Sequence, residues 1–398
     1  MTKKPTNISE RVIALGAGGT GGHMFPAAAL ARELDARGFA TLLVTDDRGK
    51  RFSDQFASSE IIEIDAGTPM RGGLRARVSA FMHIIKGVRF AYRLLRAKKV
   101  ACVVGFGGYP SLPTALAARL AGIPYILHEQ NAVFGRANRF LAGGARSIAI
   151  SFADTSAIKT SQLDKVVLTG NPVRREIVGV GEKAYVAPKA DGEISILAVG
   201  GSLGARIFAD IIPAAMTFLD AEIKERLHVT QQCRPEDRAR VAEAYVRAGI
   251  MAQTPDFIRD MAGALRSSHL VIARAGAGSV SEVGAARRPA IFVPLAIAAN
   301  DHQTMNARAL GDHGAAWVMS EAEFQPGPLA QLLTELVRDG ERLKDAANLA
   351  VKKIPLGAAA ALADLIEQAI HKTSASEETK KPIPVAKNGR GKAKRVAV

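Results

Sequence analysis

The sequence has few cysteines, few aromatic residues and no long apolar run. Its 398 residues include two cysteines, Cys102 and Cys233, which are far apart. They form neither a disulfide framework nor a metal-binding spacing, which fits a reducing cytoplasm. Aromatic residues make up 5% of the chain, too few for a protein built on aromatic stacking platforms.

The sequence also argues against a membrane-spanning protein and against a secreted one. No apolar run reaches the roughly 18 residues that cross a bilayer. The first residues, MTKKPTNISE, are polar and do not form the apolar core of a signal peptide. We therefore expect a soluble or peripheral protein.

Acidic residues are missing from two segments of the chain, and these segments carry its excess charge. The formal net charge is +15, and the segment from Arg71 to Lys99 holds nine Lys/Arg and no Asp/Glu. The segment from Lys372 to the end has a net charge of +6. Local basic segments on a balanced body indicate an anionic surface, either membrane or nucleic acid. For the tail, a merely solvated basic segment is an equal alternative.

Short apolar runs rich in β-branched residues alternate with Ala/Leu-rich stretches. Runs that are continuously apolar predict strands of a parallel sheet covered on both faces. The predicted strands are Val12–Leu15, Thr41–Val44, Ile61–Ile64, Val100–Val104, Tyr125–Leu127, Ser147–Ile150, Val166–Thr169, Ile194–Val199, Val229–Gln231, Leu270–Ala273, Ile291–Val293 and Ala316–Val318.

The pattern loosens after residue 174 and restarts near 194, which indicates two domains. We expect an α/β protein of two Rossmann-like domains, 1–174 and 175–354, that face each other across a cleft. Residues 355–371 are expected to form a last helix that packs back on the first domain. Residues 372–398 are rich in Lys, Pro and Gly, so we expect a disordered basic tail.

The first glycine cluster, Gly16 to Gly22, follows the first predicted strand and opens a helix. It contains G-x-G-x-x-G, with Asp46 and Asp47 after the next strand, and alone this pattern is typical of a nicotinamide or flavin site. The cluster holds more glycine than such a site needs, and helix N-terminal N–H groups bind anions and oxygen ligands. A pure packing role is the structural alternative.

His23 is the titratable residue at the end of this cluster. A histidine takes a proton from a hydroxyl near neutral pH, which is typically worth about 10²- to 10⁴-fold in rate. Single histidines are usually structural, but the position directly after a glycine loop favours a role in the site.

Two more polar clusters follow strands in the first half. Gly105–Tyr109 (GFGGY) is a second glycine loop, and His128–Asn131 (HEQN) follows the strand that ends at Leu127. Four consecutive polar side chains at a strand exit indicate a hydrogen-bonding cluster. Capping of the next helix is the structural alternative.

The second half repeats the strand, glycine turn and helix. Gly200–Arg206 (GGSLGAR) is placed to bind a diphosphate at a helix N-terminus. After another strand, Glu282 falls about one turn into a helix that follows Gly276 and Gly278. It either interacts with the helix dipole or binds vicinal ribose hydroxyls, and the preceding glycines favour the ribose. Asn300–Gln303 follows a third strand.

All of these clusters follow strands, at their carboxyl ends, where open α/β sheets bind ligands. Two sheets with facing carboxyl edges would bring every cluster into one cleft. The sequence has no prominent Asp-x-Asp pair, so we expect no metal and no other cofactor. Helix N-termini and Arg174 are expected to neutralise the charge of a leaving group.

Taken in order, GGTGGH, GFGGY, HEQN, GNPVR, GGSLGAR and the loop Gly276–Glu282 resemble the MurG family, from about Arg11 to Ile370. The resemblance implies a glycosyltransferase-B fold and an inverting transfer of N-acetylglucosamine from UDP-N-acetylglucosamine. The implied acceptor is the 4-hydroxyl of undecaprenyl-diphospho-N-acetylmuramoyl-pentapeptide, which converts lipid I to lipid II in peptidoglycan biosynthesis. The implied location is peripheral, at the cytoplasmic face of the bacterial inner membrane.

The resemblance also implies roles for single residues. His23 is the candidate base for the acceptor hydroxyl, or a residue that positions donor or acceptor. Arg174 and Ser202 are implied to lie near the diphosphate. Ile258 is implied to lie by the uracil, and Glu282 to hold the ribose. The other implied donor-binding residues are Thr20, Gly21, Gly22, Asn131, Ala277, Gly278, Ser279 and Gln303.

The chain departs from the family pattern at two positions and at its end. Ala275 stands where a serine is common, so any contact from that hydroxyl is absent. Thr304 stands where a second glutamine is common, so only Gln303 is carried over. The basic tail lies outside the family core.

The Arg71–Lys99 segment combines an apolar and a basic pattern at helical spacing. Its apolar residues are Val78, Phe81, Met82, Ile85, Val88 and Leu95, and Lys86, Arg89, Arg93 and Arg96 recur on another face. We expect part of the apolar stripe to pack inward. The basic residues, with Phe81 or Phe90, are expected to face an anionic membrane rather than nucleic acid.

Three other functions compete with this interpretation. A dinucleotide oxidoreductase explains Gly16–Gly21 but not the second glycine turn at Gly200–Gly204. A UDP-sugar-dependent diacylglycerol glycosyltransferase shares the expected fold and membrane surface, but is not expected to carry both GGTGGH and HEQN. A non-enzymatic basic adaptor rests on charge alone.

Overall fold

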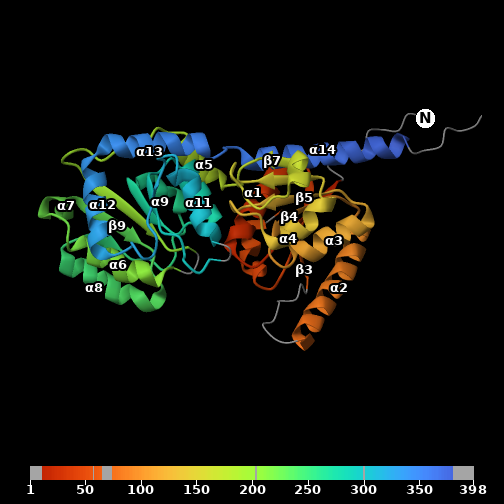
Figure 1. Cartoon of the computed structure of the whole chain (residues 1–398), viewed down its shortest axis with the longest axis horizontal. Coiled ribbons are helices and arrows are strands. Elements are labelled where there is room, and N and C mark those ends of the chain that lie inside the picture. The colour runs from red at the N-terminus through yellow and green to blue at the C-terminus, as the bar shows by residue number, and fades with distance from the viewer. Residues whose placement is uncertain (1–10, 57, 65–73, 202–203, 299–300, 380–398) are drawn as a thin grey trace, which may run out of the picture.

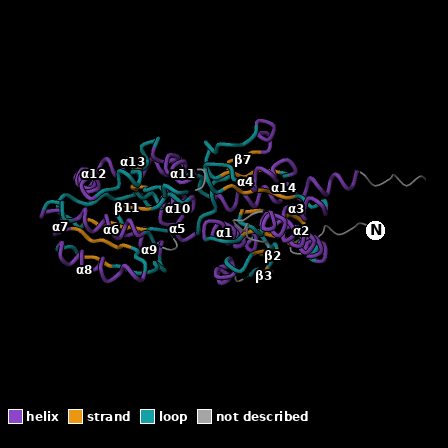
Figure 2. Tube along the Cα trace, turned by 60° about the horizontal axis from the view of Figure 1, so that its bottom comes forward, coloured by secondary structure: helices purple, strands orange, loops and turns teal. Residues whose placement is uncertain are grey.

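The computed structural model describes residues 11–56, 58–64, 74–201, 204–298 and 301–379, without the side chains of 74–81 and 373–379. Two α/β domains lie end to end, and a last helix runs back along the first of them (Figure 1). In both domains helices surround the strands (Figure 2). The expected fold class of two Rossmann-like domains is confirmed.

The N-terminal sheet is entirely parallel, with the strand order β3-β2-β1-β4-β5-β6-β7. Its strands are β1 (Val12–Ala17), β2 (Ala40–Thr45), β3 (Glu60–Glu63), β4 (Val100–Gly107), β5 (Tyr125–Glu129), β6 (Ser147–Ile150) and β7 (Val166–Leu168). Side chains on both faces of the central strands are buried, because helices cover both sides of the sheet. The continuous apolar runs of the sequence follow from this double burial.

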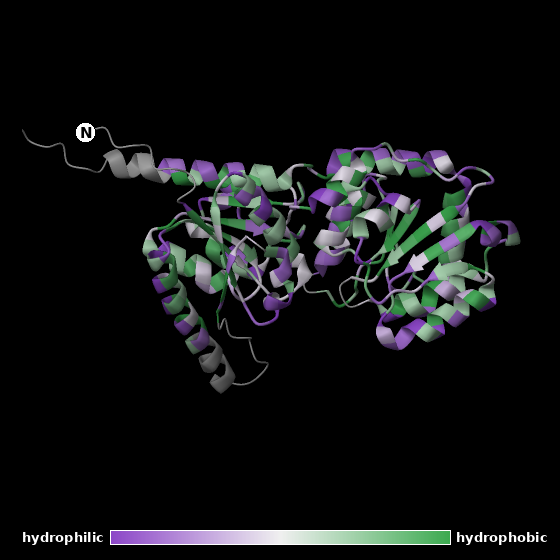
Figure 3. Cartoon of the chain, turned by 180° about the vertical axis from the view of Figure 1, so that it is seen from behind, coloured by the Kyte–Doolittle hydropathy of each residue, from purple (hydrophilic) through white to green (hydrophobic). Residues whose placement is uncertain are grey.

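Helices and short 3₁₀ turns connect these strands. They are α1 (Gly21–Ala36), η2 (Gly49–Phe56), α2 (Leu74–Ala97), α3 (Ser111–Ala121), α4 (Arg136–Leu141), η3 (Ala142–Gly144) and η4 (Thr160–Lys165). The helix α2 packs against α3 and carries both hydrophilic and hydrophobic residues along its described length (Figure 3). Among the described residues, no helix is long and apolar enough to cross a membrane.

The C-terminal sheet repeats the pattern, with the parallel order β10-β9-β8-β11-β12-β13. Its strands are β8 (Ile194–Val199), β9 (Leu227–Gln231), β10 (Met251–Gln253), β11 (Leu270–Ala273), β12 (Ala290–Phe292) and β13 (Trp317–Val318). The sequence pattern missed β10. This strand is short, lies at the sheet edge and is exposed throughout, so it lacks the apolar run that marks the buried strands.

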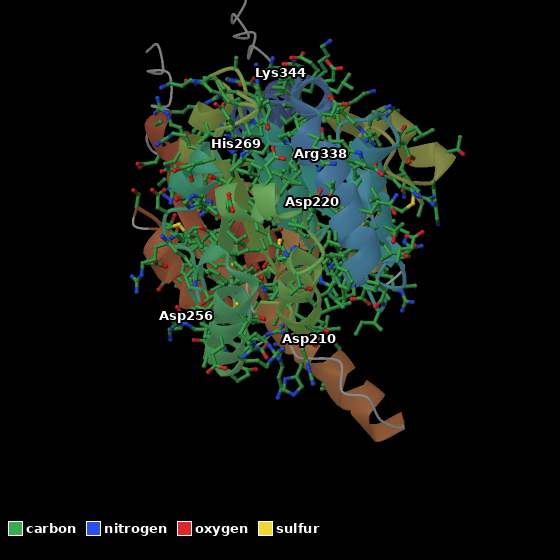
Figure 4. The ribbon with its side chains drawn as sticks, turned by 90° about the vertical axis from the view of Figure 1, so that its left-hand side faces the viewer. Asp210, Asp220, Asp256, His269, Arg338 and Lys344 are labelled. Atoms are coloured by element: carbon green, nitrogen blue, oxygen red, sulfur yellow. The ribbon has the colours of Figure 1, made fainter. Side chains whose placement is uncertain are left out.

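The C-terminal domain is built from helices α5 to α13. They are α5 (Arg175–Gly181), α6 (Arg206–Met216), α7 (Ala221–Arg226), η5 (Pro235–Asp237), α8 (Arg238–Ala248), α9 (Met261–Ser267), α10 (Ala277–Ala285), α11 (His302–Gly311), α12 (Pro326–Arg338) and α13 (Gly340–Lys353). An ion pair of 2.6 Å joins Arg338 of α12 to Asp220, which precedes α7 (Figure 4). Ion pairs therefore tie exposed elements together on this side of the domain.

The last helix, α14 (Ala358–Thr379), packs on the N-terminal domain. Leu362 and Ile366 are completely buried in the same cluster as Ile13 and Leu30. Burying one such side chain stabilises the fold by about 1.5–3 kcal/mol. Arg37 at the end of α1 adds ion pairs to Asp364 and Glu367.

The expectation that a disordered tail begins at residue 372 is wrong for residues 372–379, which are helical. The helix α14 continues to Thr379, because no proline or glycine stands between Lys372 and Thr379 and helix propagation is cooperative. Residues 380–398 lie outside the described residues.

Candidate active site

Two glycine loops of the N-terminal domain meet because their strands are neighbours. Gly16 of β1 pairs with Gly105 of β4, where the strand order reverses and Rossmann-like sheets bind ligands. Gly108 has a φ of +74°, and a Cβ there would lie 2.5 Å from the carbonyl oxygen of Gly18. Only glycine allows this close approach, so the two loops form one surface.

Thr20 and Asp46 fix the first loop. Thr20 is the extended N-cap of α1, and its carbonyl accepts a hydrogen bond of 3.1 Å from the amide of His23. Asp46 accepts 2.9 Å hydrogen bonds from the amides of Gly19 and Gly49. Although burial opposes it, these bonds and Arg48 lower the pKa of Asp46. The carboxylate that suggested a dinucleotide site therefore holds the loop itself.

His23, the candidate base, lies in the first turn of α1 and is half-buried. Its Nδ1 lies 3.3 Å from Oε1 of Gln130. Burial lowers the pKa of His23 below its ordinary value, and Glu129, Gln130, Phe106 and Asp46 offset part of that shift. The imidazole is therefore neutral at pH 7, as a general base must be.

Behind His23 lie two side chains that sequence reasoning left without a role. The amide nitrogen of Gln130 lies 2.8 Å from the carbonyl oxygen of Phe106 and 3.0 Å from Nδ1 of His128. The other ring nitrogen of His128 lies 3.1 Å from the carbonyl oxygen of Gly170. His128 is completely buried, and burial lowers its pKa to about 4. The HEQN cluster is thus a hydrogen-bonded cluster, as its polarity predicts.

Glu129 organises the loop after β5. It is buried and accepts hydrogen bonds from the amides of Asn131 and Gly135 and from the side chains of Asn131 and Asn138. These donors satisfy a buried carboxylate, which is otherwise costly. Glu129 therefore holds Asn131, one of the predicted donor-binding residues, in place.

Asn131 meets the second domain through Asn306 of α11. The side-chain nitrogen of Asn306 donates to Oδ1 of Asn131 and to the carbonyl of Ala275, both at 3.1 Å. Its oxygen accepts a 2.8 Å hydrogen bond from the amide of Ala132. Asn306 is completely buried and was missed from the sequence. The signal was its place one helical turn after Gln303.

Arg174 and Glu282 form an ion pair in the structure. Nε and Nη2 of Arg174 lie 3.0 and 2.9 Å from the same oxygen of Glu282, and the guanidinium lies 5.2 Å from the centre of the Phe25 ring. Burial raises the pKa of Glu282, and Arg174 opposes that shift. The structure thus brings together Arg174, predicted to lie near the diphosphate, and Glu282, predicted to hold the ribose.

Other predicted donor-binding residues lie at the start of helices or in nearby loops. Gly21 and Gly22 open α1. Ala277, Gly278 and Ser279 form the first turn of α10. Ile258 packs partly buried before α9. Ser202 lies outside the described residues.

Gln303 lies in the first turn of α11, and its side chain holds the backbone after β12. Its Oε1 accepts a 3.0 Å hydrogen bond from the amide of Leu295. Arg274 supports the same loop through the carbonyls of Val293 and Pro294 and a 2.6 Å ion pair with Glu321. In the part of the chain that the structure describes, no group of three or more His, Cys, Asp or Glu side chains could hold a metal ion.

The sequence matches two family models in chain order. These are the glycosyltransferase family 28 N-terminal domain over residues 13–150 and the glycosyltransferase family 28 C-terminal domain over residues 195–368. A Neisseria meningitidis UDP-GlcNAc 2-epimerase is 14% identical with a TM-score of 0.62, covers 90% of this chain and 100% of its own, and shares the fold alone.

Close relatives match almost the whole chain. The UDP-N-acetylglucosamine–N-acetylmuramyl-(pentapeptide) pyrophosphoryl-undecaprenol N-acetylglucosamine transferase of Granulibacter bethesdensis is 44% identical over 91% of this chain and 94% of that protein. The transferase of the same name from Zymomonas mobilis is 43% identical over 89% and 91%. The crystal structure of Acinetobacter baumannii MurG has a TM-score of 0.73 at 33% identity and covers 90% of this chain and 99% of its own. The chain therefore belongs to the MurG family within glycosyltransferase family 28.

Proposed function

We propose that the protein transfers N-acetylglucosamine from UDP-N-acetylglucosamine to the 4-hydroxyl of undecaprenyl-diphospho-N-acetylmuramoyl-pentapeptide. The observation that carries this proposal is the likeness to transferases of that printed name, at 41–44% identity along both chains. A neutral histidine beside two joined glycine loops can supply the general base that such a transfer needs. The reaction belongs to peptidoglycan biosynthesis and so to cell shape and division.

In this mechanism His23 is the general base. The acceptor O–H bond breaks, its proton moves to His23, and its electron pair forms the bond to the anomeric carbon. The bond from that carbon to the UDP oxygen breaks on the opposite face, and the diphosphate leaves with the electrons. General-base assistance of this kind is typically worth about 10²- to 10⁴-fold.

The donor is held by residues from both domains. Arg174 and the N-terminus of α10, at Ala277, Gly278 and Ser279, meet the diphosphate charge, with Ser202 beside them. Glu282 holds the ribose, and Ile258 contacts the uracil. Thr20, Gly21, Gly22, Asn131 and Gln303 line the sugar. Because Arg174 and Glu282 are paired in the structure, donor binding exchanges that pair for contacts to the diphosphate and the ribose.

The acceptor is a lipid, and α2 provides a surface for the membrane that contains it. Val88 and Leu95 pack toward the domain core, whereas Met82, Ile85 and Phe90 are exposed. Lys86, Arg89, Arg93 and Arg96 share the exposed side, so apolar and basic groups face outward together. Val78 and Phe81 lie outside the residues whose side chains are described. This supports peripheral binding to the cytoplasmic face of the inner membrane.

The test offers two donors and two acceptors to the full-length protein. Labelled UDP-N-acetylglucosamine or UDP-glucose is incubated with the muramoyl-pentapeptide lipid or with diacylglycerol in the same vesicles. We expect transfer only for UDP-N-acetylglucosamine with the muramoyl-pentapeptide lipid. Transfer to diacylglycerol alone would replace the proposal with the diacylglycerol glycosyltransferase. In a parallel binding measurement, tight binding of NAD and none of UDP would replace it with the oxidoreductase.

A further inference from the structure

One line of hydrogen bonds connects the candidate base to the linker between the domains. It runs from His23 to Gln130, from Gln130 to His128, and from His128 to the carbonyl of Gly170. Gln130 and His128 are buried. Gly170 lies between β7 and α5, where the chain passes into the C-terminal domain, and packs against Pro355 between α13 and α14, where the chain returns. The line therefore ends on backbone where both chain connections between the domains meet.

Backbone carbonyls fix the orientation of every group in this line. The carbonyl of Phe106 only accepts hydrogen bonds, so the group of Gln130 that faces it is the NH₂. The same NH₂ faces Nδ1 of His128, which must therefore be the unprotonated nitrogen. The proton of His128 is then on Nε2, where it donates to the carbonyl of Gly170.

The same reasoning reaches His23. With its NH₂ turned to Phe106 and His128, Gln130 presents its oxygen to Nδ1 of His23. An amide oxygen only accepts, so Nδ1 of His23 carries the proton and donates it. In a neutral imidazole the remaining lone pair is then on Nε2.

We propose that Gln130 and His128 are positioning residues that hold His23 as the Nδ1–H tautomer, which leaves Nε2 to take the proton of the acceptor hydroxyl. This inference rests on the proposed function for its kinetic consequence, but the tautomer itself does not depend on it. Gln130 acts directly on His23. His128 acts through Gln130, because its Nδ1 and the carbonyl of Phe106 together accept from the amide NH₂ and hold it in this orientation.

The charges around His23 are compatible with this role. Burial lowers the pKa of His23, and the carboxylates of Glu129 and Asp46, with Gln130 and the carbonyl of Phe106, offset only part of that shift. His128 stays neutral because burial lowers its pKa to about 4. The line is therefore uncharged at pH 7, and its hydrogen bonds persist when His23 receives a proton on Nε2.

The first experiment observes the tautomer without turnover. The full-length protein is labelled with ¹⁵N in its histidine rings, and long-range ¹H–¹⁵N spectra are recorded in the neutral range, with His23 assigned through His23→Gln. We expect a protonated Nδ1 in the wild type and a shift toward the Nε2–H tautomer in Gln130→Met. The matched control is Gln162→Met, because Gln162 is also a buried glutamine of this domain and no hydrogen bond links it to His23.

The second experiment measures the kinetic consequence. A wrong tautomer removes the base without removing the substrate, so Gln130→Met is expected to lower kcat by about 10- to 100-fold while KM for UDP-N-acetylglucosamine stays within about threefold. For His128, Asn retains an acceptor where Nδ1 stood and Phe does not. We therefore expect His128→Asn to keep more of the Nδ1–H tautomer and of kcat than His128→Phe.

The outcomes separate this inference from the proposed function. A proton on Nε2 of His23 in the wild type would overturn it, as would a Gln130→Met variant that keeps the wild-type tautomer or kcat. If Gln162→Met lost kcat equally, the effect would be general to buried glutamines and the inference would fail. A wild type with the expected tautomer but no transfer would refute the proposed function and support the tautomer assignment.

Discussion

The first six strands of each domain follow the same order, but the two domains differ in the chemistry of their sheet edges. At the carboxyl edge of the sheet in the N-terminal domain, His23, Gln130 and His128 are uncharged and are ordered by hydrogen bonds. Around the corresponding edge of the C-terminal sheet lie two ion pairs, Arg174 with Glu282 and Arg274 with Glu321. A base must be neutral before it takes a proton, whereas a diphosphate needs positive charge. The comparison predicts that N-terminal changes affect kcat and C-terminal changes affect donor binding.

The largest expected effect is on the N-terminal side. His23→Ala removes the base, so kcat should fall by at least about 100-fold while KM for the donor stays within about threefold. His313→Ala, an exposed histidine at the end of α11, is the control and should keep wild-type rates. Steady-state assays with both substrates varied measure this. A large rise in donor KM with little change in kcat would give His23 the alternative role of positioning the donor.

The outer surfaces of the domains differ as well, and α2 tests that difference. Replacing Lys86, Arg89 and Arg93 by Gln should weaken binding to phosphatidylglycerol vesicles by about 3 kcal/mol, or roughly 100-fold, because each basic group near an anionic surface contributes about 1 kcal/mol. The control removes the same charge from the C-terminal domain, at the exposed Arg247 and Arg338 and the partly exposed Lys344, which are already ion-paired. Co-sedimentation at low and high salt measures both. Equal losses of vesicle binding in the two triple variants would mean that net charge, and not the position of the basic residues on α2, determines binding.

The sequence predicted the local structure, but it did not predict the tertiary contacts between distant side chains. The strands and glycine loops follow from short apolar runs and from the residues that end them. The pairing of Arg174 with Glu282 joins residues 108 positions apart, and no local pattern encodes it. Gln130 looked like one polar residue among four, because its role is set by the carbonyl of Phe106, on another strand.

Buried histidines give the two domains different responses to pH. His128 is completely buried with a pKa of about 4, against 6.5 in the unfolded chain. Between these values the unfolded chain binds a proton that the folded chain does not, so stability falls as pH falls, by about 1.4 kcal/mol per unit. From pH 6.5 to 5 the loss is about 2 kcal/mol. It is absent above pH 6.5.

Denaturant unfolding of the N-terminal domain at several pH values measures this effect. His128→Asn should flatten the dependence below pH 6.5, whatever it does to stability at pH 7. His269→Asn is the counterpart in the C-terminal domain. Burial also lowers the pKa of His269, but this ring is only half-buried, so its contribution should be smaller. Parallel slopes for wild type and His128→Asn would contradict the assignment.

The smallest of these effects tests the C-terminal edge. Glu282→Gln keeps the shape of the side chain and removes its charge, so it replaces charge-assisted hydrogen bonds to the ribose by neutral ones. The difference between such bonds is about 1–1.5 kcal/mol, which predicts a rise of roughly 10-fold in donor KM with kcat within about threefold. Glu321→Gln, which breaks the Arg274 pair, should not share this effect.

A second ligand separates the ribose role of Glu282 from its role as the partner of Arg174. If Glu282 holds the ribose hydroxyls, 2′-deoxy-UDP should inhibit the wild type more weakly than UDP, and the ratio of inhibition constants should approach one in Glu282→Gln. If Glu282 serves only to hold Arg174, the substitution weakens both inhibitors alike and the ratio is unchanged. The ratio of the two inhibition constants cancels any general loss of nucleotide affinity, so it reports only the interaction between the 2′-hydroxyl and the carboxylate of Glu282. It therefore decides whether the C-terminal edge binds the donor through the separate charges of its ion pair or merely through the arginine.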